Sequence, residues 1–197
     1  MSESIFFAYI DRMKYIRRWG LMRSSMPENV QEHSMQVAVL SHALAVIGRD
    51  ICRKPLDPAR IAAAALYHDC SEIFTGDLAT PVKYKNDRLS GAYKEAELEA
   101  KRSLFDTLPE ALKPGFSEVV FFEEEQPVLY RYIRAADKLS AYIQCQNELA
   151  SGNGDFRQAE ATLRATLDAM AADMEELDYF LKHFIEGFRL TVDELSR

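Results

Sequence analysis

The chain has 197 residues, of which 48% are hydrophobic, as is typical of a globular protein and not of a disordered or fibrous one. Its formal net charge of -7 argues against a general binder of nucleic acids or anionic membranes, because both partners require a positive surface field. The 8 glycines and 7 prolines fall well below the roughly 24 expected at average usage, so long helices are favoured over many short strands.

Cysteine usage and apolar runs indicate the compartment. The 3 cysteines are odd in number and lack C-x-x-C spacing, which is typical of reduced thiols and not of a disulfide framework. The apolar run at residues 5–10 is too short for a signal peptide, and the run at 61–67 is far below membrane-spanning length. We therefore expect a soluble, cytoplasmic protein with no membrane partner.

Apolar spacing predicts the first helix, and a capping pattern predicts the start of the second. Apolar residues recur at helical spacing through residues 6–16 and predict an amphipathic helix. Asn29 followed by Glu32 resembles a capping box and predicts a second helix, which Gly48 can end.

The third predicted helix is almost wholly apolar. It begins after the Asp57-Pro58 pair, a cap followed by proline at the first helical position, and runs to about residue 69. Because it has no polar face, we expect it in the centre of the fold. Residues 74–90 are predicted as loop, since glycine, proline and asparagine interrupt every helical period there.

The rest of the chain is predicted to be helical. We expect helices at residues 91–107, 115–124, 127–150, 155–173 and 176–190. No segment alternates convincingly with period two, and no repeat of fixed period is present. The sequence therefore predicts one all-α domain over residues 1–197, with a core of about 29–142 and C-terminal helices at 155–195 packed on it.

The segment 11–23 is basic although the chain is acidic. It holds five basic side chains against Asp11 alone, a local charge of +4. A solvated helix face is the ordinary interpretation of such a run. The alternative is a local anion site, small enough for one phosphate.

The adjacent pair His68-Asp69 follows the apolar segment 61–67. A buried carboxylate without a partner is costly, so it must be protonated, paired or bound to a metal. Adjacent residues of a helix diverge by about 100°, so both reach one ion only near a helix end. The loop that begins at Phe74 makes this possible.

Two further candidates have ordinary alternatives. Asp137 borders the apolar face of the 127–150 helix, and its alternative is a weak surface ion pair with Arg134. His33 lies near the start of the second helix, and its alternative is a core histidine with one hydrogen bond.

Together, His33, His68, Asp69 and Asp137 form a mixed nitrogen and oxygen set. Such a set suits manganese, cobalt, iron or a similar six-coordinate ion better than a closed structural zinc site. An ion with open positions can bind a phosphate oxygen and lower the pKa of a bound water. Glu72 shares a helical face with His68 if the helix continues, and could take a proton from the water or protonate the leaving oxygen.

Several motifs together resemble a known family. They are Asn29 to Ser34 (NVQEHS), Tyr67 to Glu72 (YHDCSE), Thr75 to Lys83 (TGDLATPVK) and the pair Ala136-Asp137. These segments resemble the HD-domain phosphohydrolases, and most closely the bacterial 5′-deoxynucleotidases. The order H…HD…D belongs to the whole superfamily, whereas the Arg18-Trp19 pair and the TGDLATPVK loop are more specific. The likeness covers nearly the whole chain.

The resemblance implies a compact HD-domain helical bundle that forms a homodimer. It implies hydrolysis of deoxyribonucleoside 5′-monophosphates to deoxynucleoside and phosphate, with a divalent ion such as cobalt or manganese.

The resemblance also assigns roles to residues. It implies metal ligation by His33, His68, Asp69 and Asp137, with Glu72 as the catalytic acid or base. Arg18 would orient the phosphate in catalysis, and Trp19 would hold the nucleotide near its sugar. The implied substrate pocket is lined by Asp77, Leu78, Ala79 and Thr80, and the substrate also contacts His33, Asp69 and Asp137. Ala79 stands where the family's loop is expected to have proline.

Two rival functions remain open. One is another reaction of the same superfamily, on a nucleoside triphosphate or an alarmone, which should add Lys or Arg beside the second and third ligands. Residues 61–82 contain neither Lys nor Arg, which favours a monophosphate. The other rival is a helical module that binds a nucleotide without cleaving it. The complete ligand set and Glu72 count against that module.

Overall fold

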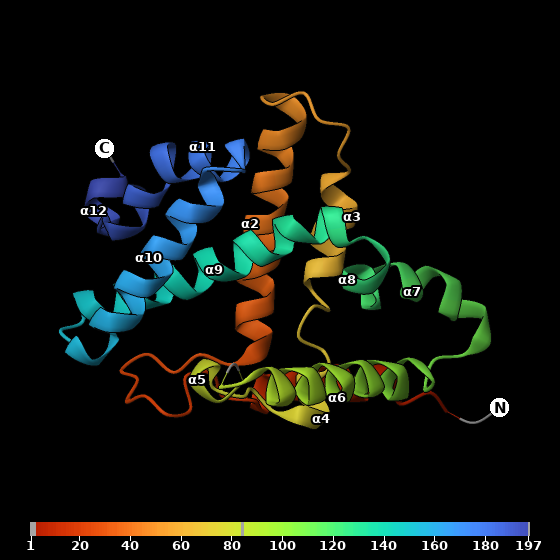
Figure 1. Ribbon diagram of the computed structural model, residues 1–197. Coiled ribbons are helices and arrows are strands. Elements are labelled where there is room, and N and C mark those ends of the chain that lie inside the picture. Colours follow the sequence, from red (N-terminus) through yellow and green to blue (C-terminus); the bar gives the residue numbers. More distant parts are fainter. Residues whose placement is uncertain (1–2, 84, 197) are drawn as a thin grey trace.

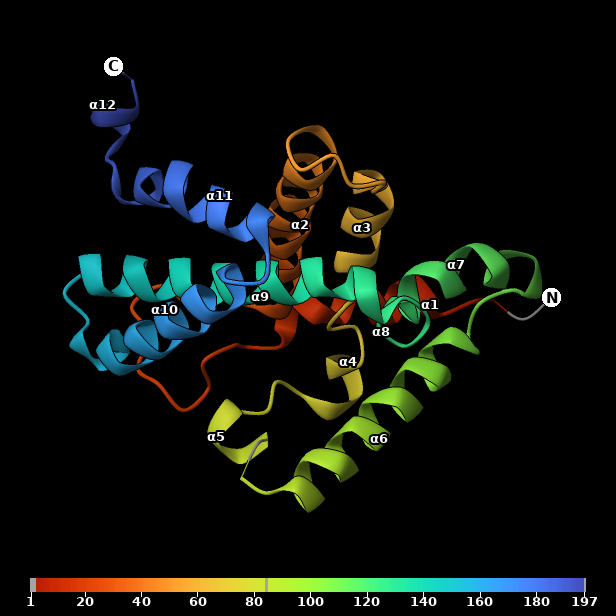
Figure 2. The same cartoon turned by 45° about the horizontal axis from the view of Figure 1, so that its top comes forward.

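The computed structural model describes residues 3–83 and 85–196, except for the side chain of Thr80. Within these ranges the regular elements are all helical, apart from one isolated antiparallel bridge between Arg17 and Asn29 (Figures 1 and 2). The all-α prediction is confirmed. No helix in this part of the chain is both long and apolar enough to cross a bilayer.

The N-terminal third differs from the prediction mainly in its first helix. Helix α1 (Phe6–Ile10) continues as a 3-10 turn, Asp11–Tyr15, instead of one helix over 6–16. Helix α2 (Val30–Asp50) begins at the predicted capping box, with Asn29 accepting from the Glu32 amide and Glu32 accepting from the Asn29 amide. It runs two residues past Gly48.

The third helix ends earlier than predicted. Helix α3 (Pro58–Ala65) gives way to turns at residues 66–71, and α4 (Glu72–Thr75) is a separate element. The amides of Tyr67 and His68 bond three residues back instead of four, and the His68 ring Nδ1 lies 2.7 Å from the Ala65 carbonyl oxygen, so this acceptor bonds within the turn and not to Asp69 as in a continuing helix. Glu72 and His68 therefore do not share one helical face, which corrects the prediction.

The predicted loop 74–90 is partly helical. Gly76, with φ +71°, ends α4, and a segment without regular structure leads to the short helix α5 (Thr80–Lys83). Helix α6 (Asp87–Phe105) starts four residues before the predicted boundary. Asn86 causes this difference, because its side chain accepts a hydrogen bond from the Leu89 amide and caps the helix.

The remaining helices follow the predicted order. The predicted helix 115–124 is split at Phe121 into α7 (Lys113–Val120) and α8 (Phe122–Glu125), and α9 (Pro127–Ala150) has the predicted bounds. After it come α10 (Arg157–Ala171), α11 (Glu175–His183) and α12 (Val192–Leu195). Short 3-10 turns lie at Glu110–Leu112, Gly154–Phe156 and Ile185–Arg189.

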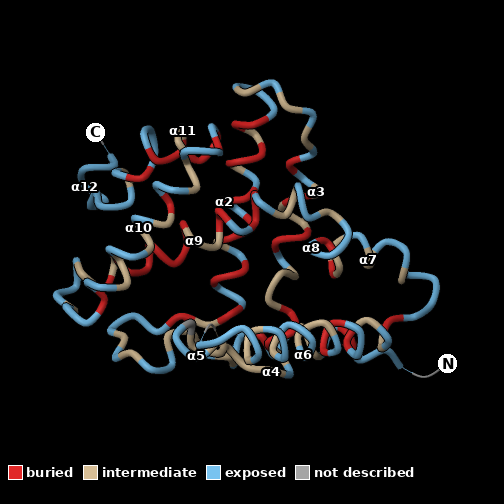
Figure 3. Tube along the Cα trace, in the orientation of Figure 1, coloured by how far each residue is buried: buried red, intermediate tan, exposed pale blue. Residues whose placement is uncertain are grey.

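The packing places one end of α2 at the centre of the candidate site. Helix α9 crosses α2, α3 lies beside α2, and α10 and α11 pack on α9 and α2 (Figure 1). The larger buried cluster draws on all five of these helices, as the red segments in Figure 3 indicate. A smaller cluster joins α1, α6 and α7. The domain limits of 1–197 and 29–142 stay a prediction.

Candidate metal and phosphate site

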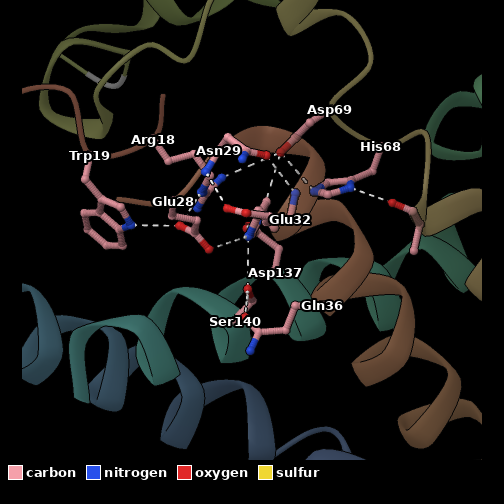
Figure 4. A network of polar contacts seen from close by, with 12 residues as sticks. Arg18, Trp19, Glu28, Asn29, Glu32, Gln36, His68, Asp69, Asp137 and Ser140 are labelled. Atoms are coloured by element: carbon pink, nitrogen blue, oxygen red, sulfur yellow. Dashed lines mark hydrogen bonds and ion pairs between the residues drawn. The ribbon is translucent and has the colours of Figure 1, made fainter. Parts of the chain in front are cut away.

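Three predicted ligands converge where α2 begins. His33 comes from the first turn of α2, and His68 and Asp69 come from the turns after α3; one donor atom of each lies within 4.8 Å of the others. Asp69 Oδ2 lies 3.1 Å from His68 Nε2 and 3.6 Å from His33 Nε2. Figure 4 shows Asp69 and His68 side by side.

The partners of the two imidazoles fix which nitrogen carries the proton. His33 Nδ1 lies 3.0 Å from Ser140 Oγ, whose hydroxyl donates to Gln36 Oε1 at 2.6 Å, so Ser140 Oγ accepts from Nδ1–H. His68 Nδ1 lies 2.7 Å from the Ala65 carbonyl oxygen, which can only accept. In the neutral form of each ring, Nε2 is therefore the unprotonated nitrogen, and in both rings it is the atom that faces the site.

These nitrogens face acceptors. Both Nε2 atoms are buried and have no hydrogen-bond partner among the described residues. Their near neighbours are carboxylate oxygens, which are also acceptors. Buried lone pairs in such contact are unfavourable unless a proton or a metal cation lies between them, and, against the opposing effect of burial, the neighbouring Asp69 raises the pKa of His68. The residues present thus fit a metal ion.

Asp137 joins the group from α9. Its Oδ1 lies 3.2 Å from His33 Nε2, and its Oδ2 lies 2.9 Å from Lys138 Nζ. Its carboxylate thus contacts Lys138 and His33, not the predicted alternative partner Arg134. Burial favours the neutral acid, but His33 and Lys138 hold the pKa of Asp137 well below its usual value.

Arg18 brings the positive charge of the basic segment into the site. Its side chain is 12% exposed, with Nε 2.9 Å from Glu28 Oε2 and Nη1 3.7 Å from Asp69 Oδ2. Burial opposes the charge, but Glu28, Asp137 and Asp69 raise the pKa of Arg18. The guanidinium therefore stays charged next to the candidate ligands, where it can meet an anion.

Trp19 lies beside Arg18 and is tied to the same carboxylate. Its indole Nε1 lies 3.0 Å from Glu28 Oε2, and its ring packs edge-on against Phe156 at a centroid distance of 5.1 Å. Figure 4 shows Glu28 between Arg18 and Trp19.

Glu72 and Asp77 act on the site electrostatically. Glu72 begins α4, is 7% exposed, and its Oε2 has no hydrogen-bond partner among the described residues. Burial, and then the charges of Asp69 and Asp77, raise the pKa of Glu72 well above its usual value. Burial likewise raises the pKa of Asp77, against the opposing charge of Arg18.

The other predicted pocket residues follow Asp77. Leu78 and Ala79 are half-buried in the segment between α4 and α5. The Ala79 carbonyl accepts from the amides of Val82 and Lys83, at 2.8 and 3.1 Å, and so begins α5. The side chain of Thr80 lies outside the described part of the structure.

Comparison with known proteins identifies the family. The model of the family described as 5′-deoxynucleotidase YfbR-like matches residues 5–188. The chain belongs to the YfbR-like family. This YfbR-like chain is 45% identical over 196 residues to a 5′-deoxynucleotidase of Vibrio cholerae, covering 100% of both chains. It is 43% identical over 201 residues to the 5′-deoxynucleotidase YfbR of Escherichia coli, covering 100% of this chain and 98% of that one.

Solved structures confirm the fold of the YfbR-like chain. An HD-domain phosphohydrolase of Listeria innocua matches with a TM-score of 0.80 and 22% identity, over 93% of this chain and 87% of that one. The cyanophage S-2L HD phosphohydrolase DatZ, described as bound to dA and one catalytic Zn2+ ion, matches with a TM-score of 0.65 and 19% identity, over 95% and 98%.

Sequence reasoning missed two side chains of this YfbR-like site. Ser140 follows Asp137 by three residues on α9, so helical spacing alone places both on one face. Glu28 precedes the helix cap by one residue, and no spacing rule connects it to Arg18 or Trp19. Only the bridge between Arg17 and Asn29 brings Glu28 beside them.

Proposed function

We propose that this chain is a metal-dependent phosphomonoesterase that hydrolyses deoxyribonucleoside 5′-monophosphates to deoxynucleoside and phosphate. The observation that carries the proposal is the pair of buried Nε2 atoms of His33 and His68 without hydrogen-bond partners among the described residues, which meet at Asp69 beside the largely buried Arg18. Full-length likeness to 5′-deoxynucleotidases of two bacteria supports the substrate class.

The proposed metal site uses His33, His68, Asp69 and Asp137 for one divalent cation. Two imidazole nitrogens and two carboxylate oxygens suit cobalt or manganese. When bound, such an ion polarises a phosphate oxygen and lowers the pKa of a bound water.

Arg18 would hold the phosphate. Its Nε is engaged by Glu28, which turns the other end of the guanidinium toward Asp69. A planar, permanently charged donor there would bind the phosphate dianion and stabilise the charge that develops as water attacks phosphorus.

Glu72 would serve as the general acid. Because its pKa is raised well above the usual value, its carboxyl carries a proton near neutral pH. That proton would pass to the 5′ oxygen of the deoxynucleoside as the bond from phosphorus to this oxygen breaks, leaving Glu72 as a carboxylate. Trp19 and the segment 77–80 would line the sugar side of the substrate.

One assay tests the function. Phosphate release is measured from dAMP, AMP and dATP, each with cobalt, manganese, zinc or a chelator. We expect dAMP to be hydrolysed fastest and the chelator to abolish activity. Equal rates on AMP and dAMP would contradict the proposed preference for deoxynucleotides. Activity in the presence of the chelator would contradict the proposed metal dependence.

We further propose that the protein is a cytoplasmic homodimer. Cys52, Cys70 and Cys145 are free, which agrees with a reducing compartment. Several large apolar side chains close to the C-terminus in sequence are exposed and could contact a second copy: Phe184, Phe188, Leu190, Val192 and Leu195. Light scattering on the purified protein tests the dimer, and a monomer at micromolar concentration contradicts it.

A further inference from the structure

Besides engaging Arg18, Glu28 lies close to two further residues of the site, Trp19 and His33. Its side chain is 9% exposed and lies at the end of the irregular segment before α2. Oxygen Oε2 accepts from Arg18 Nε at 2.9 Å and from Trp19 Nε1 at 3.0 Å. Oxygen Oε1 lies 3.8 Å from His33 Nδ1. One carboxylate thus connects the proposed phosphate, sugar and metal sides of the site (Figure 4).

The main chain fixes Glu28 opposite its partners. The Arg18 amide donates to the Glu28 carbonyl oxygen at 3.0 Å, and the Val30 amide donates to the Ile16 carbonyl oxygen at 3.0 Å. These two bonds pair the segment around Arg18 with the segment around Glu28. Because the backbone spacing is fixed, the length of the Glu28 side chain decides where its carboxylate meets Arg18 and Trp19.

Trp19 needs such a partner because its backbone is strained. Its φ of +60° lies in the left-handed region, which bulky residues rarely adopt. The surrounding contacts must hold this conformation. Phe156 packs against one side of the indole, and Glu28 accepts its only hydrogen-bond donor.

We propose that Glu28 is a positioning residue that holds the Arg18 guanidinium and the Trp19 indole at a fixed spacing, so that both ends of one deoxynucleotide are bound together. The inference rests on the proposed function. Hydrogen bonding through a single oxygen couples the two side chains, so loss of that oxygen frees both. The reach of the side chain matters more than its charge, since each partner needs an acceptor at the same point.

Three variants separate reach from charge. Glu28→Gln keeps an oxygen at full reach without the charge, Glu28→Asp keeps the charge but is one methylene shorter, and Glu28→Ala removes both. Glu32→Gln is the matched control, because this exposed carboxylate in the first turn of α2 bonds to the Asn29 amide and not to Arg18 or Trp19. Each variant is assayed with the bound metal quantified, on dAMP, on AMP and on phenyl phosphate, which lacks the sugar and base.

We expect Glu28→Ala to lower kcat/KM for dAMP on the order of 10- to 100-fold, because the substrate is misplaced relative to the reacting groups. The loss on phenyl phosphate should be smaller, since this substrate does not use Trp19. Because Trp19 is proposed to hold the nucleotide near its sugar, the ratio of dAMP to AMP turnover should also fall. Glu28→Gln should recover most of the loss and Glu28→Asp little of it, with metal content unchanged in all variants.

The single tryptophan provides a readout independent of activity. We expect acrylamide to quench Trp19 fluorescence more strongly in Glu28→Ala and Glu28→Asp than in the wild type or Glu28→Gln. The positioning role would be overturned if kcat/KM for dAMP in Glu28→Asp were equal to or above that in Glu28→Gln. It would also be overturned if Glu28→Ala lost activity equally on dAMP and on phenyl phosphate. If Glu28→Ala fails to fold, the kcat/KM values of Glu28→Asp and Glu28→Gln are sufficient to test the positioning role. Failure of the wild type to hydrolyse dAMP would instead reject the proposed function, and the fluorescence result would still decide whether Glu28 holds the indole.

Discussion

The Nδ1 atom of His33 on α2 lies 3.0 Å from the hydroxyl of Ser140 on α9. Because that hydroxyl donates to Gln36, its oxygen accepts a hydrogen bond from Nδ1–H of His33, and Nε2 of the neutral ring is free for a cation. The crossing of α2 and α9 therefore sets the protonation of a candidate ligand.

Replacement of this partner should weaken the metal site. We expect Ser140→Ala to lower metal affinity about 10- to 100-fold, because the imidazole loses the acceptor that orients it. Competition against a chromogenic chelator measures the affinity. Ser41→Ala is the control, since this buried serine of α2 has no hydrogen-bond partner among the described residues. Unchanged affinity in Ser140→Ala would show that Ser140 does not orient His33.

Asp137 tests the ligand set directly. We expect Asp137→Ala to lose metal affinity by more than the roughly 10- to 100-fold typical of an outer partner, because a carboxylate 3.2 Å from His33 Nε2 would be removed. Elemental analysis of the purified variant measures occupancy. Asp168→Ala, which removes an exposed carboxylate paired with Arg164, should retain the metal. Full occupancy in Asp137→Ala would leave Asp137 as a partner of Lys138 only.

Replacement of Glu72 tests its proposed role as the general acid. We expect Glu72→Gln to bind metal and substrate normally while kcat falls about 10²- to 10⁴-fold, because the amide cannot supply the proton. Stopped assays and equilibrium binding of dAMP separate the two effects. Glu95→Gln on α6 is an exposed control. Hydrolysis near the wild-type rate in Glu72→Gln would remove Glu72 from the mechanism.

The sequence predicted which residues form the candidate site better than it predicted where the helices begin and end. It indicated that His68 and Asp69 reach one ion only near a helix end, and α3 does end before them. It could not predict that the His68 ring bonds to the Ala65 carbonyl at the end of the helix, where the backbone amide of His68 bonds to the same oxygen. That bond depends on a ring orientation, which periodicity does not contain. Asn86 was misinterpreted for a similar reason, since the same residue type both interrupts and caps helices.

Long-range partners were the least predictable part of the site. Arg18 and Trp19 were proposed from a motif, whereas Glu28 and Ser140 became visible only when the chain had folded. Glu148 is a further example. No pattern in α9 indicates that this carboxylate binds the segment preceding α2, because the contact joins residues more than a hundred positions apart.

Glu148 predicts a pH dependence of stability. Its buried carboxylate accepts hydrogen bonds from Ser24, Ser25, Met26 and Asn153, at 2.6 to 2.9 Å. Burial opposes the charge, but these donors lower the pKa of Glu148 from its usual value of 4.5 to about 2. Since the folded state has the lower pKa, this stabilisation is complete above pH 4.5 and is lost as the pH falls toward 2.

Glu148→Gln isolates this contribution. We expect it to lower the free energy of unfolding by about 2 kcal/mol at pH 7, because hydrogen bonds to a charged group are replaced by weaker ones. Urea unfolding of wild type and variant between pH 7 and 3 measures the difference. The difference should shrink as the pH falls below 4.5. A difference that stays constant with pH would mean that the ionised form is not what binds this segment.

Substitution of Gly48 in α2 by a larger residue is expected to cause a steric clash. A Cβ atom added there would lie 2.5 Å from Leu56 Cδ1 and 2.9 Å from Glu176 Oε1. Glu176 cannot retreat freely, because it bonds to Tyr132 and Lys54. We therefore expect Gly48→Ala to lower the free energy of unfolding by about 1 to 3 kcal/mol, as overpacked cores do.

The matched control is the same substitution on an open helix face. Gly91 in α6 has no atom within 4 Å of an added Cβ, so Gly91→Ala should raise the free energy of unfolding by about 0.5 to 1 kcal/mol through its helix propensity. Thermal and urea unfolding followed by circular dichroism compare the two variants. Opposite signs are expected, because the propensity gain is common to both positions and only Gly48 meets Leu56 and Glu176. If Gly48→Ala also stabilised the protein, both Leu56 and Glu176 would have to move away from α2 at little cost.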